Sequence, residues 1–295
     1  MVIGSDWFLL GAPWDCSGTG RGEARAPGAL REAGLTDRVD VDLGDAATVI
    51  ASSHRDETTG VRALSDTVAA AHALATTLCT GMRRHPGRRP LVIGGDCSLL
   101  LGIFAGLRPT LGDVGLWMVD GHPDYLDAPA SDTGETADLE LAVLTGDGPP
   151  GLVGLAKAVP MVAARYVALI GHRTTDLDPA SAGELARVPA DLFTLDSPAV
   201  LRDPHGAGRR AAAWADRLDV PMWLHLDVDV LDPSIMPAVT YPLDGGPDLD
   251  QLTAVLTPLG ASPDLLGVSI ADFRPDLDPD GEHAARLVAL LDRTL

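Results

Sequence analysis

The sequence predicts an α/β protein built on a doubly wound parallel sheet. Apolar runs of about five residues recur along the 295-residue chain, and loop residues and then a segment of helical length follow each run, which is the pattern of βα units. Several runs are apolar at every position, as expected of strands that helices cover on both faces. Hydrophobic residues make up 46% of the chain and charged residues 22%, so a large core can form. We therefore expect a central parallel sheet of about eight strands.

Eight candidate strands follow one another along the chain. They are Trp7–Leu10, Val39–Leu43, Leu91–Ile93, Leu116–Val119, Tyr166–Ile170, Leu192–Leu195, Met222–Leu226 and Leu266–Ile270. The clearest helical stretches, Thr58–Met82 and Glu282–Leu295, are rich in Ala, Leu and Arg and contain few helix breakers. No linker or internal repeat divides the sequence, so we expect one domain over residues 1–295.

The chain is strongly acidic, with 42 Asp and Glu against 22 Lys and Arg and a formal net charge of −20. An acidic protein repels phosphate backbones and anionic lipid headgroups, so neither nucleic acid nor a membrane is an expected partner. No apolar run reaches the roughly 20 residues that span a bilayer. The N-terminus lacks the basic start of a signal peptide, and three unclustered cysteines are typical of free thiols. A cytoplasmic location is therefore predicted.

In an open parallel sheet, ligands bind beyond the carboxyl ends of the strands. Asp227 and Asp229 follow one apolar run two residues apart, so both carboxylates share a face and need a cation between them. Asp120-x-His122-x-Asp124 repeats this spacing with an imidazole in the middle. Carboxylates together with one imidazole suit a divalent ion such as Mn²⁺. The spacing therefore predicts a metal site.

Three segments that follow apolar runs are Gly94-Gly95-Asp96-Cys97-Ser98, Asp120-Gly121-His122-Pro123-Asp124 and Asp227-Val228-Asp229-Val230-Leu231-Asp232-Pro233. Together they resemble, in order and spacing, the signature motifs of the ureohydrolase family, which includes arginase and agmatinase. The resemblance implies a three-layer αβα fold around a parallel sheet of eight strands, which agrees with the strand count. It also implies two Mn²⁺ ions, bridged by a hydroxide, that cleave a cationic guanidino substrate. Family members commonly form trimers or hexamers, so a homo-oligomer is implied.

Carried onto this chain, the resemblance implies a set of metal ligands. Asp120 and Asp227 would bridge both ions. One ion would add Cys97 and Asp124, and the other would add His122 and Asp229.

The resemblance also implies which residues contact the substrate. Asp272 matches the acidic position that pairs with the guanidinium, although the family usually has Glu there. Asp124 would relay a proton to the departing amine. Asp178 is a weaker match to a position at the substrate's α-amino end.

The sequence departs from the family pattern at several of these positions. Cys97 stands where the family has histidine. Because a thiolate suits Mn²⁺ poorly, that ion should bind weakly or a softer metal should replace it, unless Cys97 is only a packing residue. The proton-shuttling histidine of the family falls on Ala137. Three further positions, which hold the amino acid's carboxylate and amine, are also altered. They are occupied by Ser131, Thr133 and Glu135.

The resemblance and its departures favour hydrolysis of Nω-hydroxy-L-arginine to ornithine and hydroxyurea, because an N-hydroxyl group lowers the basicity of the guanidine where Ala137 cannot shuttle a proton. Arginase or agmatinase activity, with release of urea, is the enzymatic alternative. A metal-depleted scaffold or regulatory member is the alternative of another class. A single-zinc deacetylase on a related fold is less consistent with the additional carboxylates Asp124 and Asp229. His225, in an apolar strand, is interpreted as a satisfied core histidine, whereas His172 and Arg173 are weak candidates for substrate contact.

Overall fold

The computed structural model describes residues 6–295, which form one eight-stranded parallel sheet with helices on both faces. The sheet has the order β2-β1-β3-β8-β7-β4-β5-β6. This confirms the predicted three-layer αβα fold with a parallel sheet of eight strands. The strands are β1 (Trp7–Ala12), β2 (Val41–Asp45), β3 (Arg89–Gly94), β4 (Gly115–Val119), β5 (Val167–Ile170), β6 (Phe193–Leu195), β7 (Met222–Asp227) and β8 (Leu265–Ala271).

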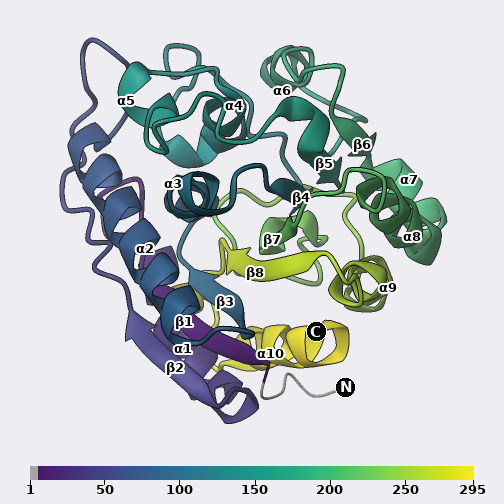
Figure 1. Cartoon of the computed structure of the whole chain (residues 1–295). Coiled ribbons are helices and arrows are strands. Elements are labelled where there is room, and N and C mark those ends of the chain that lie inside the picture. Colours follow the sequence, from purple (N-terminus) through teal and green to yellow (C-terminus); the bar gives the residue numbers. More distant parts are fainter. Residues whose placement is uncertain (1–5) are drawn as a thin grey trace.

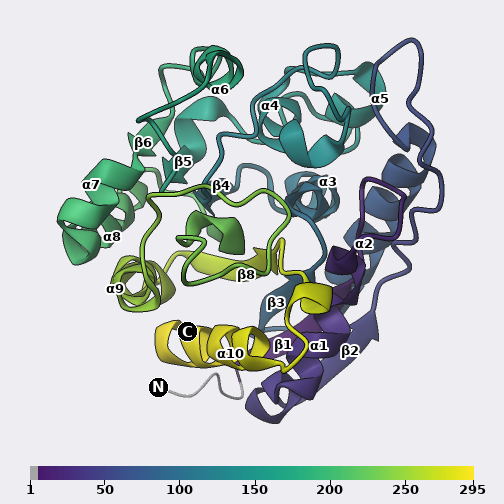
Figure 2. The ribbon, with the colours of Figure 1, turned by 180° about the vertical axis from the view of Figure 1, so that it is seen from behind.

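Two layers of helices cover the sheet. Helices α1, α8, α9 and α10 contribute to the core on one face, and α2, α3, α4 and α5 contribute to the core on the other. Figures 1 and 2 show α2 and α3 on the side of the sheet opposite α9 and α10. The helices are α1 (Ala26–Glu32), α2 (Leu64–Arg84), α3 (Leu100–Leu111), α4 (Glu140–Thr145), α5 (Pro150–Val153), α6 (Pro179–Leu185), α7 (Ser197–Arg202), α8 (Pro204–Ala215), α9 (Leu249–Gly260) and α10 (Glu282–Thr294).

The continuous apolar runs are explained by this double cover. In β1, Trp7 and Leu9 pack into the core on the α10 face, whereas Phe8 and Leu10 pack into the core on the α2 face. Successive side chains of a strand point to opposite faces, so a strand with helices on both sides is apolar at every position. Within residues 6–295, no helix combines the length and apolar character that crossing a membrane requires.

The predicted helix over residues 58–82 was wrong at its start. The helix begins at Leu64, because Ala63 adopts a left-handed conformation with φ of 52°. Arg62, in the segment before it, donates its backbone N–H to the carbonyl of Gly134 at 2.6 Å. This contact holds the segment against the 131–135 loop and keeps it out of the helix.

Candidate functional site

Four neighbouring strands bring the candidate ligands to one edge of the sheet. Strands β3, β8, β7 and β4 are adjacent in the sheet although they are far apart in the chain. Cys97 follows β3, Asp272 follows β8, Asp227 ends β7 and Asp120 follows β4. Because the sheet is parallel, all four residues lie at the carboxyl ends of their strands.

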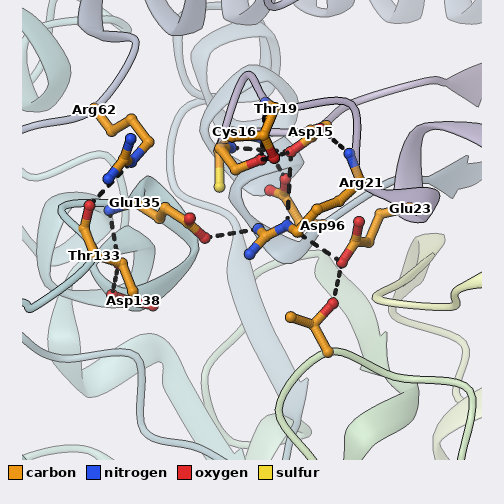
Figure 3. Close-up of polar contacts among 12 residues, drawn as sticks. Asp15, Cys16, Thr19, Arg21, Glu23, Arg62, Asp96, Thr133, Glu135 and Asp138 are labelled. Carbon is orange, nitrogen blue, oxygen red and sulfur yellow. Dashed lines mark hydrogen bonds and ion pairs between the residues drawn. The ribbon is translucent and has the colours of Figure 1, made fainter. Parts of the chain in front are cut away.

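The turn after β3 is set by its glycine and aspartate. A Cβ atom on Gly95 would lie 1.6 Å from the carbonyl oxygen of Trp14, so only glycine permits this close approach. Asp96 accepts a hydrogen bond of 2.6 Å from the backbone N–H of Cys16, as Figure 3 shows. Asp96 also caps the short 3₁₀ helix that begins at Cys97. The motif thereby fixes the backbone from which the Cys97 thiol projects.

Hydrogen bonds within the acidic cluster orient the turns after β4 and β7. The Nδ1 atom of His122 lies 2.9 Å from Oδ2 of Asp229. The backbone N–H of Asp229 donates to Oδ1 of Asp227 at 2.7 Å, and that of His122 donates to Oδ1 of Asp120 at 2.7 Å. The buried Oδ2 of Asp120 has no hydrogen-bond partner. One oxygen of Asp120 is thus held in place while the other is free to bind a cation.

The thiol of Cys97 lies among carboxylates. Its Sγ atom is 3.1 Å from Oδ2 of Asp227 and 3.6 Å from Oδ2 of Asp124. Glu140, the first residue of α4, is fully buried beside them, and both of its carboxylate oxygens lack a hydrogen-bond partner. Single ligand atoms of Cys97, Asp120, Asp124 and Glu140 all lie within 4.8 Å of one another. Sequence reasoning missed Glu140, although a lone acid in the apolar run from residue 139 to 144 was a signal for it.

The buried negative charges of the cluster favour the binding of cations. Burial, reinforced by neighbouring negative charges, raises the pKa values of Asp120, Asp124 and Asp227 well above their usual range. Burial by itself would lower the pKa of His122, but the charge and hydrogen bond of Asp229, together with the charge of Asp120, outweigh it and raise that pKa to about 9. Burying an ionised carboxylate costs free energy unless the carboxylate is paired with an opposite charge or coordinates a metal. The donor set of carboxylates, one imidazole and one thiol therefore fits divalent cations.

A cavity of about 340 Å³ adjoins the cluster. Five of the six predicted metal ligands line it, all except Asp120, and so does Ala137 at the position of the missing proton shuttle. Glu184, from α6, also lines it and was missed by sequence reasoning. Glu184 accepts a 2.9 Å hydrogen bond from the backbone N–H of Tyr125, and burial raises its pKa. The cavity is thus acidic beyond the cluster itself.

Asp272 joins the cluster and the cavity. It lines the cavity beside Cys97, and its backbone N–H donates to the carbonyl of Gly95 at 2.7 Å. Its φ of 66° is in the left-handed region, as is the φ of 48° at Asp124. Aspartate tolerates this conformation better than most residues, and such backbone strain tends to gather at functional sites. Burial raises the pKa of Asp272 to about 7.

The predicted substrate-binding residues are placed differently from one another. Thr133 lines the cavity, whereas Ser131 is buried and donates to Oδ2 of Asp138 at 2.6 Å. Glu135 does not line the cavity, and it accepts a 2.6 Å charge-assisted hydrogen bond from Nη2 of Arg21 (Figure 3). Of these three loop residues, only Thr133 is therefore in position to contact a ligand in the cavity.

Asp178 is exposed and lies outside the cavity that adjoins the cluster. It caps the N-terminus of α6, accepting from the backbone N–H of Ala180 at 2.7 Å and of Ser181 at 3.1 Å. These hydrogen bonds lower its pKa. Asp178 lines a second cavity of about 360 Å³, which shares His122, Ser181 and Glu184 with the first. Asp178 thus lines the neighbouring cavity and not the one that adjoins the acidic cluster.

Arg173 lies outside the first cavity and hydrogen-bonds to backbone carbonyls in the loops that follow β7. Its guanidinium donates to the carbonyls of Val230 at 2.9 Å and Leu243 at 2.7 Å. His172 is buried, with its Nδ1 unpartnered, and burial lowers its pKa to about 4. Neither residue lines the first cavity, so the contacts show Arg173 in a structural role.

Comparisons with known proteins agree with this geometry. The sequence model of the Arginase family matches residues 5–295. The chain belongs to the arginase family. It is 30% identical to the arginase of Brevibacillus brevis over 292 residues, which cover 96% of this chain and 95% of that protein. It is 29% identical to the arginase of Bacillus caldovelox, with 96% and 95% covered.

Solved structures of arginase-family proteins share the fold. The crystal structure of the Bacillus caldovelox arginase superposes with a TM-score of 0.85 at 26% identity, covering 98% of both chains. The formimidoylglutamase of Bacillus subtilis superposes with a TM-score of 0.76 at 18% identity, covering 98% of this chain and 86% of that chain, and shows the fold alone. This arginase-family chain is therefore a hydrolase whose candidate metal ligands meet at one edge of the sheet.

Proposed function

We propose that this arginase-family protein is a binuclear manganese hydrolase that cleaves the guanidino C–N bond of an arginine-related compound. The observation that carries the proposal is the shared cavity, in which five predicted metal ligands and Asp272 face one space. Two cations held by these ligands would supply a water of lowered pKa as the nucleophile. The family match over nearly the whole chain supports the same chemistry.

The residues of the chain would position the substrate and move its protons. Asp272 would hold the planar guanidinium through charge-assisted hydrogen bonds. Asp124 would pass a proton to the departing amine as the C–N bond breaks. The methyl group of Ala137 lines the cavity where a proton-shuttling side chain would be needed, and it cannot take part.

The preferred substrate is Nω-hydroxy-L-arginine, which water would split into ornithine and hydroxyurea. Its N-hydroxyl group lowers the basicity of the guanidine, so the reaction depends less on the help that Ala137 cannot give. Asp272 is shorter than the Glu that the family usually has at this position, and it would leave room for that substituent. Both arguments favour the same substrate.

A second candidate substrate is agmatine, because the cavity is acidic beyond the metal cluster. Asp132, Asp138 and Glu184 line it, while its described lining includes no Lys or Arg. A substrate with an amine and no carboxylate suits such a lining better than an amino acid does.

The test is a comparison of three substrates on manganese-loaded protein. Nω-hydroxy-L-arginine, L-arginine and agmatine are supplied at equal concentrations, and ornithine, putrescine, urea and hydroxyurea are measured. We expect the highest kcat/KM with the hydroxylated substrate. Faster release of ornithine from L-arginine would refute that preference, and faster release of putrescine would favour agmatine. Fewer than one bound ion per chain, with no turnover, would indicate a non-catalytic member.

A further inference from the structure

His225 is only half satisfied, contrary to the expectation from its apolar strand. It lies on β7 two residues before Asp227, so the two side chains point to the same face of the sheet. Its ring is fully buried, and Nδ1 lies 2.7 Å from Oγ of Ser269 on β8. Nε2 has no hydrogen-bond partner. A buried polar atom of this kind calls for an explanation, because leaving it unpaired costs roughly 1–3 kcal/mol.

The imidazole ring of His225 lies near two candidate ligands. One ring nitrogen of His225, Sγ of Cys97 and one carboxylate oxygen of Asp120 lie within 4.8 Å of one another. Oδ2 of Asp120 is itself buried without a partner. His225 and Asp120 thus each carry an unpartnered buried atom, and both side chains lie beside the Cys97 thiol. A divalent cation bound between the three donors would satisfy all of them.

Ser269 prepares the ring for this role. Its Oγ accepts a hydrogen bond of 2.9 Å from Nε1 of Trp223, and it can also accept the proton of His225 Nδ1. The lone pair of the unpartnered His225 Nε2 is then available to a cation. A metal-binding histidine commonly has its other ring nitrogen fixed by such a partner, which sets both tautomer and ring orientation.

We propose that Cys97, Asp120 and His225 form one metal position of the centre, and that this position takes a borderline cation such as Zn²⁺ in preference to Mn²⁺. His225, from β7, would thereby supply the imidazole that position 97 lacks. The inference rests on the proposed two-metal hydrolase and changes one part of it, because the position beside Cys97 would hold Zn²⁺, bound also by His225, in place of one Mn²⁺.

The chemistry of the three donors favours this choice. Thiolate, imidazole and carboxylate are the ligands of tetrahedral zinc, at bond lengths of about 2.0–2.3 Å, which place ligand atoms roughly 3.3–3.8 Å apart. A group within 4.8 Å reaches that spacing by an inward movement of about 1 Å or less. A thiolate and a carboxylate also balance the two positive charges, so the buried position becomes neutral. Mn²⁺ prefers oxygen ligands and gains less from the thiolate.

The test measures metal binding directly. Metal-free protein is titrated with Zn²⁺ or Mn²⁺ against a chelator, and bound ions per chain are counted by mass spectrometry. We expect wild-type protein to bind one Zn²⁺ per chain far more tightly than Mn²⁺. His225→Ala should weaken that Zn²⁺ by at least roughly 100-fold, and Ser269→Ala by roughly 10- to 100-fold. The Mn²⁺ bound at His122 and Asp229 should be retained.

Cobalt provides a spectroscopic readout of the same position. Co²⁺-loaded wild-type protein should show a thiolate-to-metal charge-transfer band that disappears in Cys97→Ser and shifts in His225→Ala. His283→Gln is the matched control, because His283 also has one unpartnered ring nitrogen, its Nδ1, but lies outside the cluster. It should change neither the band nor the affinity.

The possible failures are distinguishable. If wild-type protein binds neither metal, both the proposed function and this inference are wrong. If wild-type protein binds two Mn²⁺ as tightly as Zn²⁺, or if His225→Ala keeps wild-type Zn²⁺ affinity, the inference alone is wrong and His225 is a packing residue. Should His225→Ala fail to fold, unchanged affinity and an unchanged cobalt spectrum in Ser269→Ala would overturn the inference.

Discussion

The ion pair between Arg21 and Glu135 allows a prediction of how much stability is lost when the pair is removed. Nη2 of Arg21 and Oε2 of Glu135 lie 2.6 Å apart, and the side chains are only 19% and 7% exposed. At an effective dielectric constant of about 20, their gross attraction is about 6 kcal/mol. Desolvation of both groups offsets much of that attraction, while removal of one partner leaves the other charge buried.

We expect Glu135→Gln to lower the free energy of unfolding by about 2–3 kcal/mol. The loss is smaller than the roughly 3–5 kcal/mol typical of a fully buried pair, because Arg21 is partly exposed and keeps Glu23 at 3.7 Å. Urea denaturation of Glu135→Gln, Arg21→Gln and the double variant completes a double-mutant cycle, which isolates the pairwise energy. The exposed Glu57→Gln is the control and should stay within about 0.5 kcal/mol of wild type.

The same variants distinguish a structural from a substrate-binding Glu135. If the Glu135 carboxylate has a structural role as the ion-pair partner of Arg21, the coupling energy between the two residues should be about 2 kcal/mol and KM should change little. A coupling below about 0.5 kcal/mol, together with a tenfold or larger rise in KM, would refute the reasoning and return Glu135 to the substrate.

Three further predictions concern the site and its surroundings. Cys97→His should tighten Mn²⁺ binding by at least roughly tenfold, about 1.4 kcal/mol, in chelator competition, and unchanged affinity would mean that Cys97 is not a ligand. Asp272→Asn should lower kcat/KM by at least roughly 100-fold at unchanged metal content, and a small effect would exclude Asp272 as the partner of the guanidinium. Burial lowers the pKa of His172 to about 4 in the folded protein, below its value of about 6.5 in the unfolded chain. As the pH falls, the unfolded chain therefore binds the proton first, and the free energy of unfolding decreases between about pH 6.5 and pH 4. In metal-free protein the free energy of unfolding should fall by about 2 kcal/mol at pH 5, as measured by urea denaturation. This decrease should be absent from His172→Asn. If the two proteins show the same pH dependence, His172 is not its cause.

The sequence predicted the elements of the fold well because their cause is local. Each of the eight expected strands overlaps an observed one. Inner strands such as β3 and β4 are buried on both faces and therefore have nearly continuous apolar runs. The helix expected at residues 282–295 is α10, which ends one residue earlier at Thr294. The error at residues 58–63 has a tertiary cause, because the hydrogen bond from Arg62 to the distant Gly134 has no signal in the local pattern.

The candidate site was predictable where its residues occur in motifs and not where they occur alone. Asp120, Asp227 and their neighbours are spaced two apart after apolar runs, and this pattern is visible in the chain. Glu140 and Glu184 each stand singly on a helix, and only the packing of α4 and α6 brings them to the cluster and the cavity. Glu135 is the opposite case, a residue in a motif whose predicted role differs from its observed contact. Its position predicted contact with the substrate, whereas its carboxylate accepts a hydrogen bond from Arg21.

By itself, the sequence determined the parallel α/β fold, the family resemblance and the turns that carry the ligands, because periodicity and short motifs depend on residues near one another in the chain. Only the tertiary structure decided which side chains share one volume. The strand order places β8 and β7 between β3 and β4, and this order brings His225, Asp227 and Asp272 to Cys97. Whether a buried histidine is satisfied or left with a free nitrogen depends on contacts between strands that lie far apart in the chain, and no local pattern encodes these contacts.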